Sequence, residues 1–241
     1  MHRTLVYHHF ESIDSTNTYA KAHALQFHPD QLVLISADEQ TAGRGRFKRP
    51  WISPKGVNLY ATYCFFIAPE FARSISQMAA VSIATLLLSY SLSPQIKWPN
   101  DLLLNRKKIA GILSEVQFQT TSAQVFLGIG INVNMSQSFL DTIDQPATSL
   151  AIETKRIWDR KALLSELTEQ IQTDLALFEK EGFASFYTRF EALLANRNEM
   201  IRIHDGATTW EGIFESITSD GKLTLRLADG SHRVFFSGDI Q

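Results

Sequence analysis

Two apolar stretches, "KIAGILSEVQF" at 108–118 and "AQVFLGIGINV" at 123–133, form the middle of the sequence. Both are long enough, and rich enough in β-preferring residues, to be strands. Because the connection between them is short, we expect the two strands to be antiparallel neighbours. "GIGIN" at 128–132 resembles a dinucleotide-binding fingerprint only superficially, since it lies within a strand and no helix follows it.

Patterns on either side of this pair predict both helices and strands. Residues 159–181 carry apolar side chains at a helical spacing, and Gly182 ends that helix. The remaining patterns predict helices at 15–25, 73–92 and 183–194, strands at 31–40 and 57–67, a turn at 99–101 and a hairpin tip at 105–107.

The C-terminal segment has a different pattern of apolar and polar residues. After Asn196 apolar and polar residues alternate, and Asp-Gly dipeptides begin at 205, 220 and 229. Asp-Gly favours tight hairpin turns, because positive φ angles are accessible there. Three hairpins in so short a segment predict a small, curled β-barrel. We therefore expect a first domain at 1–195 and a C-terminal β domain at 196–241.

The composition is that of an ordinary globular protein, with 44% hydrophobic and 20% charged residues. The single cysteine, Cys64, excludes a disulfide within the chain and suits a reducing compartment. The N-terminus shows no secretory signal, and the longest apolar stretch, 78–92, is better explained by a buried helix than by a membrane span. We expect a cytoplasmic protein without membrane contact. The formal net charge of -2 argues against a broad nucleic-acid surface.

The stretch "TAGRGRFKRPW" at 41–51 concentrates four cations, two glycines and a tryptophan, with no acid. Glycines permit unusual backbone conformations, and arginines can form bidentate contacts with phosphate oxygens. Trp51 could cover a base. The loop lacks the lysine-serine end of a Walker A motif. It predicts phosphate binding without specifying the chemistry, and a solvated surface loop is the alternative.

Two further motifs offer polar groups at strand ends. "KWPND" at 97–101 could present Asn100 and Asp101 to Mg²⁺ held together with substrate phosphates, although such a turn is often only a turn. Lys108 opens an apolar strand and could hold a carboxylate or a phosphate as a point charge. Its neighbours Arg106 and Lys107 are equally well explained as solvated cations at a hairpin tip.

Taken together, five motifs resemble those of the biotin–protein ligases in order and spacing. "LFEKEG" at 177–182 and the ending "SGDI" at 237–240 resemble the same family. Each piece alone is weak, but five in register along nearly the whole chain are specific. The five are "STN" at 15–17, "DEQTAGRGRFKRPWISPKGVNLYAT" at 38–62, "KWPND" at 97–101, "KIAGIL" at 108–113 and "GIGINVN" at 128–134.

The resemblance implies an α+β fold, in which a mixed β-sheet flanked by helices, related to class II aminoacyl-tRNA synthetases, precedes a small SH3-like barrel. It implies that biotin and MgATP are substrates, with no tightly bound prosthetic group. Biotin would attack the α-phosphorus to give biotinyl-5′-AMP and pyrophosphate. A lysine of a biotin carrier domain, of the acetyl-CoA carboxylase type, would then attack the anhydride and release AMP.

The resemblance also implies roles for residues. Ser15, Thr16 and Gln40 match positions that hydrogen-bond the ureido head of biotin. Lys108 matches the lysine that contacts the biotin carboxylate and the α-phosphate, and it is an expected catalytic residue. Further matches to the biotin site are Asn17, Gly43, Arg44, Gly45, Arg46 and Gly111.

Around the nucleotide, Arg44 and Arg46 match loop arginines that order around the adenylate, and we expect both to be catalytic. Trp51 matches the aromatic residue that packs on adenine, and Asn132 lies where adenine is read. The remaining matches are Arg49 and Asn100 at the ATP and Asp101 at Mg²⁺.

Two departures from the family follow from the same alignment of motifs. Lys48 stands where the family often has a further glycine, so the loop is expected to be stiffer or to close differently. "STN" begins at Ser15, which leaves no room for the N-terminal winged helix of some members. We therefore expect a monofunctional ligase without sequence-specific DNA binding, and operator binding in a gel-shift assay would contradict this. A homodimer is left open.

Three alternatives remain at the level of sequence. A lipoate ligase or octanoyl transferase would share the catalytic architecture. A non-catalytic sensor of biotin or an adenylate would need the same pocket. An RNA-binding protein could use the basic loop and the barrel, but the acidic overall balance disfavours it.

Overall fold

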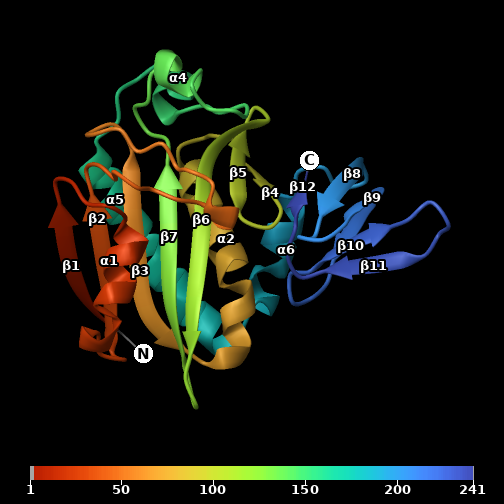
Figure 1. Ribbon diagram of the computed structural model, residues 1–241, viewed down its shortest axis with the longest axis horizontal. Helices are drawn as coiled ribbons and strands as arrows, with labels where there is room; N and C mark the ends of the chain where they lie inside the picture. Colours follow the sequence, from red (N-terminus) through yellow and green to blue (C-terminus); the bar gives the residue numbers. More distant parts are fainter. Residues whose placement is uncertain (1–2, 241) are drawn as a thin grey trace.

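The structure, a computed structural model, describes residues 3–240; residues 1, 2 and 241, which fall in the two expected domains, lie outside this range. Its main feature is a seven-stranded sheet in the order β1-β2-β3-β7-β6-β5-β4 (Figure 1). The strands are β1 (Thr4–Phe10), β2 (Gln31–Ala37), β3 (Leu59–Ile67), β4 (Gln95–Lys97), β5 (Asp101–Leu104), β6 (Lys107–Phe118) and β7 (Ala123–Ile131).

Pairing within this sheet is mixed. β1 pairs with β2 in parallel, whereas every other neighbouring pair is antiparallel. The pairing of β6 with β7 confirms the antiparallel neighbours expected from the sequence, and Asn105 and Arg106 form the tip of the β5–β6 hairpin. The mixed sheet confirms the expected fold class.

Helices cover both faces of the sheet. α2 (Ile75–Ser89) and α5 (Arg160–Glu181) share the larger apolar core on one face, and α1 (Thr16–Ala22) packs on the other (Figure 1). The segment Pro69–Ser89 is long and apolar enough to cross a membrane, but 72% of its most apolar window is buried inside the fold. The prediction of a buried helix is confirmed.

The ends of α5 agree with the sequence. Asp159 is the N-cap, and its carboxylate accepts hydrogen bonds from the backbone N–H groups of Lys161 and Ala162. Gly182 is the C-cap at a φ of 66°. The remaining helical segments are η1 (Ala24–Gln26), η2 (Arg46–Lys48), η3 (Pro69–Ser74), α3 (Gln137–Leu140), α4 (Leu150–Thr154) and α6 (Ala184–Ala192).

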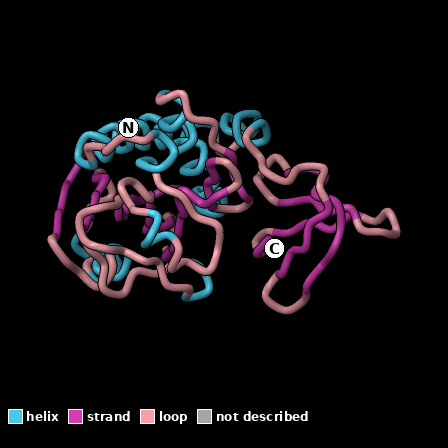
Figure 2. Tube along the Cα trace, turned by 90° about the horizontal axis from the view of Figure 1, so that it is seen from above, coloured by secondary structure: helices cyan, strands magenta, loops and turns pink. Residues whose placement is uncertain are grey.

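The C-terminal strands form a separate five-stranded antiparallel sheet in the order β11-β10-β9-β8-β12. Figure 2 shows this sheet to one side of the larger body. The three predicted hairpins are confirmed, with Gly206, Gly221 and Gly230 at positive φ in their turns. This arrangement agrees with a small SH3-like barrel. The strands are β8 (Met200–His204), β9 (Thr209–Ile217), β10 (Leu223–Arg226), β11 (His232–Phe235) and β12 (Asp239–Ile240).

The small sheet is fastened to the rest of the chain by hydrogen bonds and a shared core. The indole N–H of Trp98 donates to the carbonyl of Gly221 at 2.9 Å, and the hydroxyl of Tyr187 donates to that of Ile217 at 3.2 Å. Apolar side chains of both parts belong to one buried cluster. The "KWPND" motif therefore contacts the C-terminal sheet directly.

Strand β1 was not predicted from the sequence. Its side chains are mostly half-buried or exposed, because it lies at the edge of the sheet and only one neighbour covers it. It joins β2 in parallel through the crossover that contains α1. The pattern "TLVYHHF" is therefore too polar to stand out as a strand.

Candidate active site

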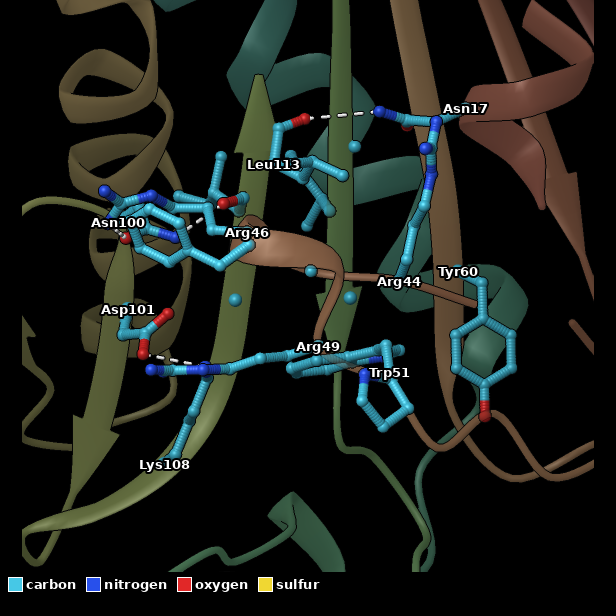
Figure 3. Close-up of a pocket in the computed structure, with 18 of the residues that line it drawn as sticks. Asn17, Arg44, Arg46, Arg49, Trp51, Tyr60, Asn100, Asp101, Lys108 and Leu113 are labelled. Atoms are coloured by element: carbon cyan, nitrogen blue, oxygen red, sulfur yellow. Dashed lines mark hydrogen bonds and ion pairs between the residues drawn. The ribbon is translucent and has the colours of Figure 1, made fainter. Parts of the chain in front are cut away.

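A cavity of about 350 Å³ opens on the α1 side of the seven-stranded sheet. Distant segments meet around it: the start of α1, the β2–β3 loop, the β4–β5 turn and strands β6 and β7 (Figure 3). The end of the small sheet also lines it, through Asp239 and Ile240. Most residues expected at the site line this one cavity: Ser15, Thr16, Asn17, Gln40, Arg44, Gly45, Arg46, Arg49, Trp51, Asn100, Asp101, Lys108 and Gly111.

The floor of the cavity is bare backbone on β6 and β7, where Gly111 and Gly130 face each other in the antiparallel pair. A Cβ atom at Gly130 would lie 2.5 Å from Cε2 of Trp51, and one at Gly111 would lie 3.0 Å from Cζ3 of the same ring. A side chain at either position would therefore push the indole away from the sheet. Gly128 makes the same kind of room for the side chain of Asn17.

One end of the cavity is polar, uncharged and buried. The backbone N–H and the hydroxyl of Thr16 both donate to Oε1 of Gln40, at 2.9 and 3.1 Å. The hydroxyl of Thr62 lies 2.8 Å from that of Thr16, and Ser15 caps α1 from the same corner. Gln40 is itself held by the hydroxyl of Ser53, at 3.2 Å from its Nε2. Such a group of fixed donors and acceptors suits a neutral polar ligand.

Beside this end, the carboxylate of Glu115 accepts hydrogen bonds from three side chains. It accepts from Nζ of Lys21 at 2.7 Å, from Nδ2 of Asn17 at 3.0 Å and from Nη2 of Arg44 at 3.3 Å. Burial alone would raise the pKa of Glu115, but the hydrogen bonds from Lys21 and Asn17 and the charge of Arg44 lower it overall. Glu115 thus stays ionised and ties the loop arginine to α1.

The opposite end of the cavity is cationic. Nζ of Lys108 lies 2.7 Å from Oδ2 of Asp101, and both side chains are largely buried, with 15% and 19% of their surface exposed. The same ammonium lies 5.3 Å from the centre of the Trp51 ring. An incoming anion would therefore meet a largely buried cation that is paired with the carboxylate of Asp101.

Two loop arginines connect this end to the small sheet. Nη1 of Arg46 donates to Oδ1 of Asn100 and to the carbonyl of Gly238, each at 3.0 Å. Burial lowers the pKa of Arg46, although the charges of Asp101 and Asp239 oppose this. Arg49 donates to Asp239, and this hydrogen bond raises the pKa of Arg49. The C-terminal residues thus form part of the cavity wall.

Two buried donors at the cavity have no hydrogen-bond partner among the described residues. They are Nε of Arg44 and the indole Nε1 of Trp51. A buried donor without an acceptor is unfavourable, because it has lost water and gained nothing in exchange. Each of these donors would gain a hydrogen bond only if the loop shifted and brought an acceptor beside it.

Comparison of the chain with known proteins identifies its family. Residues 9–132 match the model of the biotin/lipoate A/B protein ligase family, and residues 198–241 match that of the biotin protein ligase C terminal domain. The chain belongs to the biotin/lipoate A/B protein ligase family. A curated relative, the bifunctional ligase/repressor BirA of Escherichia coli, is 33% identical over 232 residues, which are 95% of this chain and 71% of the relative.

Other members of the ligase family agree over the full length. The biotin–[acetyl-CoA-carboxylase] ligase of Paracoccus denitrificans is 33% identical over 242 residues, covering 93% of this chain and 98% of the relative. The solved structure of the Aquifex aeolicus biotin protein ligase in complex with biotin and ATP superimposes with a TM-score of 0.79 at 27% identity. It covers 99% of this chain and 97% of its own.

The loop of this ligase-family member has an unusual backbone. Phe47 and Lys48 lie at φ angles of 55° and 59°, in the left-handed region that favours glycine. Lys48 therefore places a side chain where the backbone disfavours one, and the stiffer loop expected from the sequence stays a prediction.

Asn132 and Gly43 stand apart from the other expected site residues. Asn132 lines a neighbouring cavity of about 440 Å³ that shares Trp51 and Lys108 with the first. Its Nδ2 donates to the carbonyl of Thr148 at 3.0 Å, so part of its hydrogen-bonding capacity already supports the fold. Gly43 packs against another part of its own loop, where a Cβ atom would lie 2.7 Å from the Trp51 carbonyl. The roles expected for these two residues, like those of the other site residues, stay predictions.

Sequence reasoning missed several residues that shape the site. Alternate glycines in an apolar strand signal a close approach of other groups, and this signal was present at 128 and 130. No comparable signal exists for the others, because their partners are distant in sequence. The missed residues are Lys21, Thr62, Glu115, Gly128, Gly130, Gly238 and Asp239.

Proposed function

We propose that this chain is an ATP-dependent ligase that activates biotin as biotinyl-5′-AMP and transfers it to a lysine of a biotin carrier protein of the acetyl-CoA carboxylase type. The observation that carries the proposal is a single cavity with a buried uncharged polar end, a cationic end and the indole of Trp51 between them. Relatives named biotin–[acetyl-CoA-carboxylase] ligase support the carrier class.

In the first step a carboxylate oxygen of biotin bonds to the α-phosphorus of MgATP. The bond from that phosphorus to the β-phosphate oxygen breaks, and pyrophosphate leaves. Lys108, Arg44 and Arg46 offset the charge of the two anions and of the developing transition state. The polar end, at Thr16 and Gln40, holds the ureido head so that the carboxylate is delivered to the cationic end.

In the second step the amine of the carrier lysine attacks the acyl carbon of the mixed anhydride. The carbon–oxygen bond to AMP breaks, the amine loses its proton, and AMP leaves with the bond electrons. The β2–β3 loop excludes water from the anhydride between the two steps. Arg46 and Arg49, through Asn100, Gly238 and Asp239, hold the loop at the cavity.

Magnesium enters this reaction as part of MgATP. Within residues 3–240, no group of three or more His, Cys, Asp or Glu side chains is arranged to hold a metal alone. Mg²⁺ is commonly bound by one or two carboxylates together with substrate phosphates, and the single carboxylate of Asp101 fits that mode. Bound Mg²⁺ would neutralise phosphate charge.

The polar end should also favour biotin over lipoate and octanoate, the acids used by related enzymes. A ureido ring can exchange hydrogen bonds with Thr16, Asn17 and Gln40, whereas a dithiolane ring or an alkyl chain would displace water from this polar end and offer no hydrogen bond in return. We therefore expect lipoate and octanoate to be poor substrates. We also expect no sequence-selective DNA binding, because a chain with a formal net charge of -2 lacks the usual basic excess.

The test is pyrophosphate release from MgATP with biotin, lipoate, octanoate or no acid, each with and without a biotin carrier domain. We expect release that needs biotin, with labelled biotin appearing on the carrier lysine. Release with lipoate or octanoate instead would move the protein to the sister branch of the family. Biotin binding without any release would mean a sensor and would overturn the proposal.

A further inference from the structure

The β2–β3 loop leaves and returns to the sheet at two neighbouring positions. Asp38 follows the end of β2, and Asn58 precedes β3. At this base the backbone N–H of Gly56 donates to the carbonyl of Asp38 at 3.0 Å. The hydroxyl of Tyr60 donates to the carbonyl of Pro54, also at 3.0 Å. The loop is thus closed where it starts, although its tip reaches far across the cavity.

A side chain from a third element joins both ends of the loop. Arg160, the first residue of α5, donates from Nη1 and from Nη2 to Oδ1 of Asp38, each at 3.0 Å. The same Nη1 donates to the carbonyl of Asn58 at 3.2 Å. A planar guanidinium can bridge two such acceptors, whereas a lysine ammonium on its flexible stem is a single point charge.

Arg160 acts from behind the sheet. It lines a different cavity, on the α5 side, together with Leu59 and Leu164. Its backbone is fixed by the cap of Asp159 at the start of α5. The side chains of Arg160 and Asp38 are 23% and 26% exposed, so the contact is shielded from water without being fully buried. Isolated surface ion pairs of this kind contribute little to global stability.

The contact therefore matters through what it holds in place. Asp38 lies two residues before Gln40, whose Oε1 accepts both hydrogen bonds from Thr16 at the polar end of the cavity. Asn58, at the other end, accepts from the backbone N–H of Val133 through its own Oδ1 at 2.9 Å. Displacing either end would shift the loop and the polar end of the cavity together.

We propose that Arg160 is a positioning residue that clamps the two ends of the β2–β3 loop and thereby keeps the loop closed over the acyl-adenylate. It touches neither substrate nor reacting atoms. The effect on the adenylate rests on the proposed function, whereas the effect on the loop does not. The loop itself carries the trypsin sites Arg44, Arg46, Lys48 and Lys55, so its opening can be measured without any substrate.

The experiment compares full-length Arg160→Gln, Arg160→Lys, Asp38→Asn and the double variant Arg160→Gln/Asp38→Asn. The control is Lys161→Gln, which removes one positive charge from the next residue of the same helix turn. Three quantities are measured: the rate of tryptic cleavage within the loop relative to cleavage elsewhere, the rate of biotinyl-adenylate release, and kcat and KM for MgATP.

We expect loop cleavage about tenfold faster in Arg160→Gln and in Asp38→Asn, which is a change of about 1.4 kcal/mol in the opening equilibrium. The double variant should be no faster than Arg160→Gln alone, because that substitution already removes the contact with Asp38. Arg160→Lys should lie between, and Lys161→Gln should match the wild type. Adenylate release and KM for MgATP should rise in parallel with cleavage, with kcat changed less than threefold.

Unchanged loop cleavage in folded Arg160→Gln, or additive effects in the double variant, would overturn the clamp. So would cleavage that accelerates equally throughout the chain, since that reports global destabilisation. If Arg160→Gln does not fold, the comparison of Asp38→Asn with Lys161→Gln decides the question. If the wild type forms no adenylate, the proposed function fails, and the cleavage pattern still decides the clamp.

Discussion

The β2–β3 loop and the turns of the C-terminal sheet both contain residues at positive φ, but different residue types occupy these positions. In the turns, glycines occupy the positive φ positions, at 103° for Gly206 and at 83° for Gly221 and Gly230. In the first of these turns the side-chain hydrogen bonds are local: Asp205 accepts from the N–H groups two and three residues ahead. In the loop, Phe47 and Lys48 adopt positive φ without the freedom of glycine.

The partners differ as much as the backbones. Arg46 hydrogen-bonds to Gly238, 192 residues away, and Arg49 contacts Asp239 at a separation of 190. The turn at Asp205 is held by hydrogen bonds to its own side chain and serves the fold, whereas the turn at Gly221 also accepts a hydrogen bond from the indole of Trp98. A loop held by remote partners can be released when a ligand replaces those partners. Substitutions in the loop should therefore change activity more than stability, and substitutions in the turns the reverse.

The largest effect is expected at the cationic end of the cavity. Lys108→Ala removes the cation placed for the biotin carboxylate and the α-phosphate, and leaves the Asp101 carboxylate without its partner. We expect pyrophosphate release to fall about 10³-fold, with a small change in melting temperature. Lys107→Ala, at the exposed neighbouring position, is the control. A rate within tenfold of the wild type would contradict the assignment.

Arg46→Ala tests the remote anchors of the loop. It removes the hydrogen bonds to Asn100 and Gly238, so the loop should open more often and the adenylate should escape about tenfold faster. Retention of labelled biotinyl-AMP after rapid gel filtration measures this. Arg106→Ala, an exposed arginine at the β5–β6 tip, should retain the adenylate like the wild type. If the Arg46 variant retained biotinyl-AMP as well as the wild type does, the remote hydrogen bonds of Arg46 would not hold the loop closed.

Glu115→Gln should affect both properties, because this carboxylate joins the loop to α1. The amide cannot replace the charge that pairs with Lys21 and Arg44. We expect the free energy of unfolding to fall by about 1 kcal/mol, and adenylate release to accelerate a few-fold. Urea denaturation and the retention assay measure the two effects. A loss of stability with wild-type retention would show that Arg44 does not depend on Glu115.

Lys48→Gly isolates the backbone of the loop. A non-glycine residue in the left-handed region costs about 1 kcal/mol, and glycine recovers this while losing a similar amount of chain entropy on folding. The free energy of unfolding should therefore change by less than about 1 kcal/mol. Lys55→Gly, in the same loop but without a positive φ, should only destabilise. Equal destabilisation by both would mean that Lys48 bears no backbone penalty.

The smallest effect on activity is expected in a turn. Asp205 accepts hydrogen bonds from the N–H groups of Ala207 and Thr208 and from the Trp210 indole, and the first two lower its pKa most, to about 2. Because the folded pKa lies below the ordinary 3.8, this stabilisation is present above pH 4 and is lost as the pH falls toward 2. Asp205→Ala should lower the melting temperature at pH 7, lose that difference in acid and keep wild-type pyrophosphate release. A pH-independent difference would contradict this.

Much of the architecture was accessible from local sequence. α5 begins after Asp159 and ends at Gly182 as its capping residues require, and the three Asp-Gly turns lie where positive φ is cheap. The pairing of β6 with β7 follows from a short connection between two apolar segments. Edge strand β1 escaped prediction, because its half-exposed pattern resembles a loop and its parallel partner lies beyond a helix.

The candidate site likewise contains residues that could be predicted from the sequence and residues that could not. Motif residues such as Thr16, Arg46 and Lys108 could be named in advance because their chemistry stands in short, ordered segments. Glu115 and Asp239 could not, since a lone carboxylate in a strand or near a chain end has no local signature. Their roles depend on which cations the fold places beside them.

The sequence by itself determined the elements, their caps and turns, and the family to which the chain belongs, because these depend on neighbouring residues and on ordered motifs. Only the tertiary structure decided that Trp51 lies on the bare backbone of Gly111 and Gly130, that the last strand reaches the loop arginines, and that Arg160 joins both ends of the loop. The reason is physical. Such contacts join residues far apart in the chain, so their free energy exists only when the whole fold brings those residues together.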